Sequence, residues 1–268
     1  AGETLMQSAG STFPQRVSVA ILYKRLQAAL DHASGGFVQK RSSQVAALPE
    51  FEALREHARS VKEHVLAHLD SYLERYEAEV TRQGGQVHWA STDAQAREII
   101  LEICRKANAR TITKGKSMVS EEIGINDALE AAGYHVVETD LGEYIVQLAG
   151  ERPAHITVPA VHRSRGEIRE LFERVHGVSL PDDAEALTHF ASGVLRERFL
   201  AADVGITGVN FAVVETGSVV VVENEGNVRM SASLPLVHIA VMGIERFVPS
   251  FRELAVLLPL LIGSATGQ

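Results

Sequence analysis

The spacing of apolar residues changes at Gly84-Gly85, and this change constrains the fold more than any other feature of the sequence. Before these glycines, apolar residues recur every three or four positions, as they do in amphipathic helices. After them, short apolar runs alternate with stretches of helical spacing. The sequence therefore predicts an N-terminal helical extension over residues 1–85 and an α/β domain over residues 86–268.

The extension contains a long segment, residues 51–84, that is expected to form one helix. It follows Pro49 and ends at a glycine pair, and both are usual at helix ends. His64 and His68 are four positions apart in this segment and could chelate a metal ion. Because no third ligand is in view, we expect a solvated helix face and no metal site.

The α/β part is expected to consist of helices that alternate with short strands. Strands are expected at residues 86–90, 110–113, 134–140, 143–149, 155–161, 203–207, 211–215, 218–223 and 236–244. Helices are expected at residues 92–109, 120–133, 168–175, 184–200 and 251–262, with Pro259 bending or ending the last one. Such alternation, with nearly continuous apolar strands, implies a largely parallel sheet covered on both faces, with an antiparallel hairpin added.

Composition excludes several classes of protein. Thirty-four acidic and twenty-six basic residues give a formal net charge of -8, which disfavours nucleic acid as a partner. No apolar stretch approaches the length of a membrane span, and no secretory signal opens the sequence, so we expect a cytoplasmic protein. The single cysteine, Cys104, excludes a disulfide framework and cannot supply the four thiolates that usually hold an iron–sulfur cluster.

The stretch "RTITKGKSMVSEE" has the context of a phosphate-binding loop, because a strand, a glycine-containing loop and a helix start follow one another. A nucleotide-binding P-loop needs glycine where this chain has Arg110, so that function is disfavoured. We expect Lys114, Lys116 and backbone amides near Ser117 to bind a smaller anion such as a carboxylate. The alternative is a loop with two solvated lysines.

The stretch "VVETDLGEY" places Glu138, Asp140 and Glu143 at the C-terminal end of an expected strand. In open α/β sheets, ligands bind beyond these strand ends, so the three carboxylates are candidate site residues. An acidic turn that only increases solubility is the alternative.

The stretch "GITGVNFAVVETGSVVVVENEGN" contains the hairpin expected over residues 211–223. Its glycine spacing does not match the dinucleotide-binding fingerprint. Glu215 ends a run of valines, where a carboxylate is tolerated only if it meets water, a cation or a ligand. It is therefore a candidate base, nucleophile or ligand anchor. The alternative is a hairpin corner in which Glu215 accepts turn amides.

Three long stretches carry a resemblance to a known family: residues 114–162, residues 199–249 and "LLPLLIGSATGQ" at the end. Together they resemble the lactate utilization protein B family, whose members contain a LUD domain. The resemblance implies a three-layer αβα mixed sheet similar to that of sugar-phosphate isomerases and CoA transferases. Carried over position by position, it favours as site residues Lys114, Lys116, Ser117, Glu138, Asp140, Glu143, Thr207, Asn210, Glu215, Thr216, Gly217, Glu223 and Asn227, with Glu215 as the candidate base.

The resemblance also implies a function. Members of this family belong to an iron–sulfur system that oxidises L-lactate to pyruvate together with two partner proteins. They continue into a ferredoxin-like domain whose cysteines hold [4Fe–4S] clusters, and this chain stops before that domain. We therefore expect no cofactor on this chain itself, and lactate or pyruvate as its small-molecule partner. Two alternatives remain open, a non-catalytic assembly module and a domain that binds a sugar phosphate or CoA, the latter by analogy of fold alone.

Overall fold

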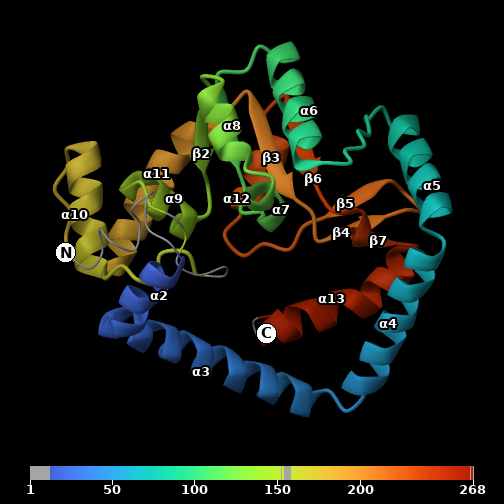
Figure 1. Ribbon diagram of the computed structural model, residues 1–268, viewed down its shortest axis with the longest axis horizontal. Coiled ribbons are helices and arrows are strands. Elements are labelled where there is room, and N and C mark those ends of the chain that lie inside the picture. Colours follow the sequence, from blue (N-terminus) through green and yellow to red (C-terminus); the bar gives the residue numbers. More distant parts are fainter. Residues whose placement is uncertain (1–12, 152, 154–157, 266, 268) are drawn as a thin grey trace.

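The computed structural model describes residues 13–151, 153, 158–265 and 267. Helices occupy the first part of the chain: α2 (Phe13–Leu22), α3 (Lys24–Ala47), α4 (Phe51–Ala67) and α5 (Leu69–Arg82). In Figure 1, α3 runs along the lower edge of the molecule, and α4 and α5 rise along one side. The helix expected over residues 51–84 is interrupted at His68, where ψ is 33°. The domain boundary at residue 85 stays a prediction.

The main sheet, sheet A, is parallel throughout, as predicted. Its strand order is β2-β1-β3-β6, formed by β1 (Thr111–Lys114), β2 (His135–Glu138), β3 (Val204–Gly208) and β6 (Val237–Val241). Because neighbouring strands run in one direction, their C-terminal ends lie at the same edge of the sheet. The candidate residues Lys114, Glu138 and Thr207 are therefore carried to a common edge.

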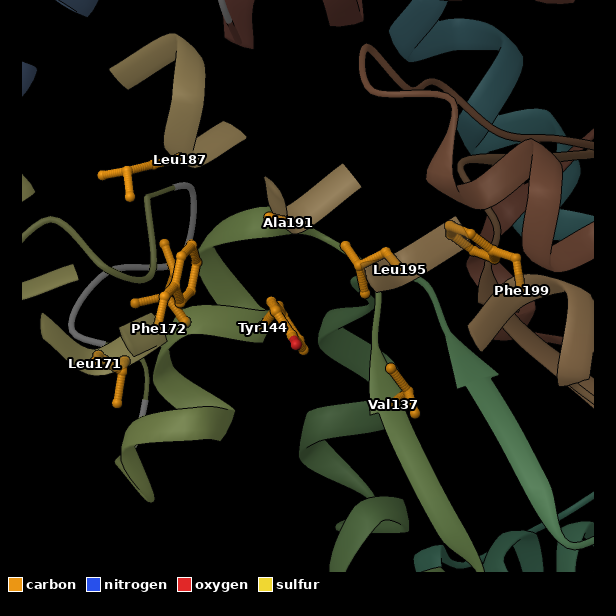
Figure 2. Packing of buried hydrophobic residues seen from close by; sticks show 9 residues of the cluster. Val137, Tyr144, Leu171, Phe172, Leu187, Ala191, Leu195 and Phe199 are labelled. Atoms are coloured by element: carbon orange, nitrogen blue, oxygen red, sulfur yellow. The ribbon is translucent and has the colours of Figure 1, made fainter. Parts of the chain in front are cut away.

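Helices cover both faces of sheet A and give the expected three layers. On one face, α6 (Asp93–Lys106) and α8 (Ile125–Ala131) pack on the strands in a cluster that includes Ile100, Leu129 and Ile206. The other face meets α9 (Leu141–Ala149), α10 (Arg165–His176) and α11 (Ala184–Ala201). Figure 2 shows this second cluster, in which Tyr144 of α9 lies between Phe172 and Leu195.

Two short helices complete the C-terminal edge, α7 (Met118–Glu122) after β1 and α12 (Asn227–Ser233) before β6. Helix α12 contacts β3 closely, since a Cβ atom on Gly205 would lie 1.8 Å from the carbonyl oxygen of Ser231. Only glycine allows this approach of helix to strand.

The hairpin does not join sheet A. It forms sheet B, with strand order β5-β4-β7, from β4 (Phe211–Val213), β5 (Ser218–Val220) and β7 (Phe247–Val248). Strands β4 and β5 are antiparallel, whereas β4 and β7 are parallel. Tyr72 and Tyr76 of α5 pack on one side of this sheet, and Leu254 of α13 (Phe251–Ala265) packs on the other. The 3-10 helix η1 (Ile244–Arg246) precedes β7.

Two expected strands are wrong, and a third is not formed in its described part. Residues 143–149 lie in α9, because the Asp140 side chain accepts a hydrogen bond from the Glu143 amide and caps a helix there. Residues 86–90 form no regular structure. In the strand expected over 155–161, residues 155–157 lie outside the described residues, and 158–161 form no strand.

Two helix predictions also need correction. The helix expected over residues 120–133 begins earlier, at Met118 after the Ser117 cap, and is divided into α7 and α8 at Gly124, which has φ of +62°. The last helix continues through Pro259 to Ala265 and is not ended by the proline.

Candidate functional site

The loops after β1, β2 and β3 meet closely at the C-terminal edge of sheet A. A Cβ atom on Gly208 would lie 2.8 Å from the Ser117 hydroxyl oxygen, and one on Gly115 would lie 3.0 Å from a methyl carbon of Val228. Polar residues from the ends of β1, β2 and β3, from the loops and from the helices α7, α8, α9 and α12 are gathered at this edge. We call this group the sheet-edge site; it consists of Lys114, Lys116, Ser117, Glu121, Asn126, Glu138, Asp140, Glu143, Thr207, Glu225 and Asn227.

Lys114 is fully buried and its charge is shared between two carboxylates. Its ammonium nitrogen lies 2.9 Å from Oε1 of Glu121 and 2.9 Å from Oε1 of Glu138. Burial alone would lower the pKa of Lys114, but the two carboxylates outweigh burial and hold this pKa above its ordinary value. Lys114 therefore connects β1, β2 and α7, and its charge is already compensated.

Glu138 presents an unused hydrogen-bond acceptor. Its Oε1 accepts from Lys114 and from Asn126 Nδ2, the latter at 2.6 Å. Its Oε2 is buried and has no hydrogen-bond partner within the described part of the chain. Burial raises the pKa of Glu138, an effect that Lys114 opposes. A buried acceptor without a partner is energetically unfavourable, so this oxygen is suited to a donor from a ligand.

Lys116 provides the cation that is not already hydrogen-bonded. Its ammonium nitrogen is buried and, among the residues described, has no hydrogen-bond partner. Oε1 of Glu143 lies 3.9 Å away, which is an ionic contact and too long for a hydrogen bond. An anion entering beside Lys116 would find a charged donor available.

Glu143 has a strongly perturbed carboxyl group. Its side chain is 6% exposed, and its backbone amide donates to Asp140 Oδ1 at 3.1 Å. Burial, together with the charges of Glu138 and Glu121, raises the pKa of Glu143 to about 7. A carboxylate with this pKa is partly ionised near neutral pH and can accept a proton from a substrate.

This pKa predicts how stability depends on pH. Because the pKa of Glu143 is about 7 in the folded protein and 4.5 ordinarily, its contribution to stability is lost as pH rises from about 4.5 to about 7. Glu143→Gln has no ionisable group at this position and does not undergo this loss of stability. The free energy of unfolding of the variant, relative to that of the wild type, should therefore be higher at about pH 8 than at about pH 5. Denaturant unfolding of both proteins at the two pH values measures the gain. Parallel pH profiles would contradict it.

Glu225, Asn227 and Thr207 also belong to the sheet-edge site. Oε2 of Glu225 accepts from the Leu141 amide at 3.2 Å, and Asn227 is buried at the start of α12. The hydroxyl oxygen of Thr207 lies 2.8 Å from Nε2 of His238, whose pKa burial lowers. Thr207 is therefore held at the end of β3 by a neighbouring strand.

The structure places the hairpin candidates elsewhere. Glu215 is exposed in the turn between β4 and β5, and its amide donates to the Pro249 carbonyl. The neighbouring Thr216 carbonyl accepts from Gln83, and Gly217 packs against the backbone of α5. This turn contacts α5 and the residue after β7, so Glu215, Thr216 and Gly217 are not brought together with Lys116 and Glu143.

Two further candidates, Asn210 and Glu223, make hydrogen bonds that fix the conformation of the loop over residues 221–226. Oδ1 of Asn210 accepts from the Val222 amide at 2.8 Å, and Oε2 of Glu223 accepts from the Arg229 amide at 3.0 Å. Both contacts are local to this loop. Asn210 and Glu223 therefore lie next to the sheet-edge site, since the same loop also contains Glu225.

Four residues of this region were not among the site residues predicted from the sequence: Glu121, Asn126, Glu225 and His238. Glu121 reads as a first-turn acid of a helix, and nothing in its local pattern indicates that it reaches Lys114. The position of Glu225 in the sequence did indicate a candidate, since it lies in the acidic stretch "ENEGN" after the hairpin.

The described residues contain no group of three or more His, Cys, Asp and Glu side chains that could hold a metal ion. Nδ1 of His68 lies 2.9 Å from the His64 carbonyl oxygen, so one of its ring nitrogens contacts the helix backbone. Cys104 is buried beneath sheet A, and burial raises the pKa of its thiol to about 11. One buried thiol does not fit the ligand set of an iron–sulfur cluster. None of the helices in the described ranges is long and apolar enough to cross a membrane.

Comparison with known proteins gives several relatives of similar identity. The chain is 44% identical over 262 residues to the "Uncharacterized electron transport protein YkgF" of Escherichia coli (strain K12), covering 98% of this chain and 55% of that protein. It is 41% identical over 264 residues to "Lactate utilization protein B" of Lysinibacillus sphaericus (strain C3-41), covering 98% and 56%. The protein of the same name in Bacillus velezensis is 43% identical over 264 residues, again covering 98% and 56%. The chain thus spans about half the length of these relatives.

No solved structure matches the chain significantly. The family model of the LUD domain matches residues 73–268, which begins within α5 and includes both sheets and the whole sheet-edge site. The resemblance found in the sequence is confirmed by this match and by the relatives. The chain belongs to the LUD domain family.

Proposed function

We propose that this chain is the substrate-binding domain of a lactate-utilization protein and that it binds L-lactate at the sheet-edge site. The observation that carries the proposal is the pairing of Lys116, a buried cation without a hydrogen-bond partner among the described residues, with Glu143, whose pKa is about 7. The names of the relatives, lactate utilization protein B and electron transport protein, agree with this proposal.

An α-hydroxy acid has the two groups that this arrangement needs. Its carboxylate pairs with the Lys116 ammonium group through a charge-assisted hydrogen bond. Its hydroxyl group donates to Glu143, or to the unpartnered Oε2 of Glu138. Propionate has the same carbon skeleton without the hydroxyl group and would satisfy only the first contact.

Oxidation of lactate to pyruvate removes two protons and two electrons. Glu143 takes the hydroxyl proton, which is within the capacity of a base with a pKa of about 7. The hydrogen on the carbinol carbon leaves with the electron pair to an acceptor outside this chain. The acceptor of this hydride is a two-electron carrier of the nicotinamide or flavin class. The electrons then pass one at a time to iron–sulfur clusters in the part of the longer relatives that this chain does not cover, and to two partner proteins.

Titration calorimetry on this chain tests the proposal. L-Lactate should bind, and Lys116→Met should weaken binding by about 10- to 100-fold, because a hydrogen bond to a charged group is lost. Lys106→Met is the control, since Lys106 is exposed and pairs only with Glu102 on α6 among the described residues. A wild-type protein that binds propionate as tightly as L-lactate would contradict a hydroxy-acid site. No binding of either acid would favour a non-catalytic assembly role.

A further inference from the structure

The loop over residues 221–226 crosses the start of α9. This loop joins β5 to α12 and has no helix or strand of its own. Glu225 is exposed as a residue, yet its Oε2 accepts the amide of Leu141, the first residue of α9, at 3.2 Å. The first amides of a helix favour a negative charge, so the Glu225 carboxylate occupies an anion position at this nine-residue helix.

The charges around Glu225 come from three elements. Asp140 caps α9, and Glu143 lies in its first turn. Lys116 follows β1, and Arg229 of α12 lies beside Gly226, since a Cβ atom there would be 3.4 Å from Nη2 of Arg229. Partial burial of its carboxyl group and the charge of Asp140 raise the pKa of Glu225, while the hydrogen bond from the Leu141 amide and the charge of Lys116 oppose this rise. The Lys116 ammonium group lies 3.9 Å from Oε1 of Glu143 and is close enough to Glu225 to affect its pKa, and within the described chain it is hydrogen-bonded to neither of them.

A carboxylate that approaches Lys116 must therefore meet repulsion from Glu143 and Glu225, and also from Asp140, which caps α9 next to them. Asp140 and Glu143 cannot move easily, because Asp140 binds the Glu143 amide and the Glu143 side chain is 6% exposed. The Glu225 carboxylate is attached to α9 by one hydrogen bond to Leu141. The next residue, Gly226, has φ of +77°, a backbone conformation in which the chain direction can change.

A second buried group also indicates a ligand at this place. Glu138 has a side chain that is 4% exposed and an Oε2 atom without a partner in the described residues. Glu138 is close enough to Glu143 to raise its pKa. The region thus contains both an unpartnered cation and an unpartnered acceptor.

We propose that the Glu225 carboxylate occupies, in the unliganded protein, the position that the carboxylate of a monocarboxylic acid takes when it binds. The ligand displaces Glu225 from the Leu141 amide, takes over that hydrogen bond and pairs with Lys116. The loop over residues 221–226 is released at the same time. This inference rests on the proposed function, because both concern the sheet-edge site.

Glu225→Gln tests the inference, since a neutral side chain competes less well for the Leu141 amide and for Lys116. At about pH 8, the variant should bind propionate and L-lactate about tenfold more tightly than the wild type. Glu122→Gln removes one charge from an exposed position on α7 and should bind both acids as the wild type does. Amide hydrogen exchange adds a second readout: propionate should increase exchange in residues 221–226 while the Leu141 amide stays protected.

The two acids separate this inference from the proposed function. Tighter binding of both acids by Glu225→Gln supports displacement, even if L-lactate is not preferred over propionate. Equal affinities of the variant and the wild type overturn displacement, even if L-lactate is preferred. If neither protein binds either acid, both proposals are overturned. Glu225→Ala repeats the test with the side chain removed.

Discussion

Lys114→Met is expected to lower the free energy of unfolding by about 3–5 kcal/mol, because it removes one partner of a buried ion pair. Lys114 is fully buried, and Glu138 would then retain a buried carboxyl group without a cation. Glu121 would lose the same partner but is partly solvated, with a side chain 36% exposed. Denaturant unfolding at neutral pH measures the loss.

Lys106→Met provides the matched control for this experiment. Lys106 has a side chain that is 74% exposed and pairs with Glu102 one helical turn away. Exposed pairs of this kind contribute less than about 1 kcal/mol. The effect of Lys114→Met should also shrink at acid pH, where Glu138 takes up a proton instead of remaining charged. A loss no larger than that of Lys106→Met would show that the ion pair does not hold the edge of sheet A together.

Gly205→Ala is expected to destabilise the protein by about 3 kcal/mol, since the added methyl group collides with backbone rather than with a mobile side chain. Its Cβ atom would lie 1.8 Å from the Ser231 carbonyl oxygen, so α12 must move away from β3. Because Asn227 at the start of α12 belongs to the sheet-edge site, binding of L-lactate should weaken as well. Unfolding by denaturant and calorimetric titration measure the two effects.

Gly193→Ala is the control for this second change. Gly193 is exposed in α11, and a Cβ atom there would have nothing within 4 Å. The same substitution should therefore be neutral or stabilising by up to about 1 kcal/mol, because alanine is a better helix former. If both alanine variants had the same stability, the close approach of α12 to β3 would be disproved.

The local sequence pattern was sufficient to predict the parallel sheet and many of the polar residues at its C-terminal edge. The runs that became β1, β2, β3 and β6 are short and apolar, and they alternate with stretches of helical spacing. Lys116, Glu138 and Glu143 follow strand ends, where parallel topology gathers them. The strands and the residues at their ends can be predicted from residues that lie within a few positions of them in the sequence.

The errors arise where distant residues decide the outcome. Residues 143–149 are apolar enough for a strand, but the Asp140 cap and the packing of Tyr144 on α10 and α11 make them helical. Glu215 ends a valine run as expected, but β4 pairs with β7, which follows more than thirty residues later. That pairing places the Glu215 turn against α5 rather than at the edge of sheet A.

The pairing of β4 with β7 also affects how the α/β part can unfold. Along the chain, β3 belongs to sheet A, β4 and β5 to sheet B, β6 to sheet A and β7 to sheet B. Neither sheet can be completed before the chain has passed through the other, so the two are interleaved and cannot behave as independent cooperative units. A break anywhere between Val213 and Val237 would separate strands of both sheets at once. The loop that carries Glu225 lies inside this interval, and its release must therefore leave the flanking strand pairs intact.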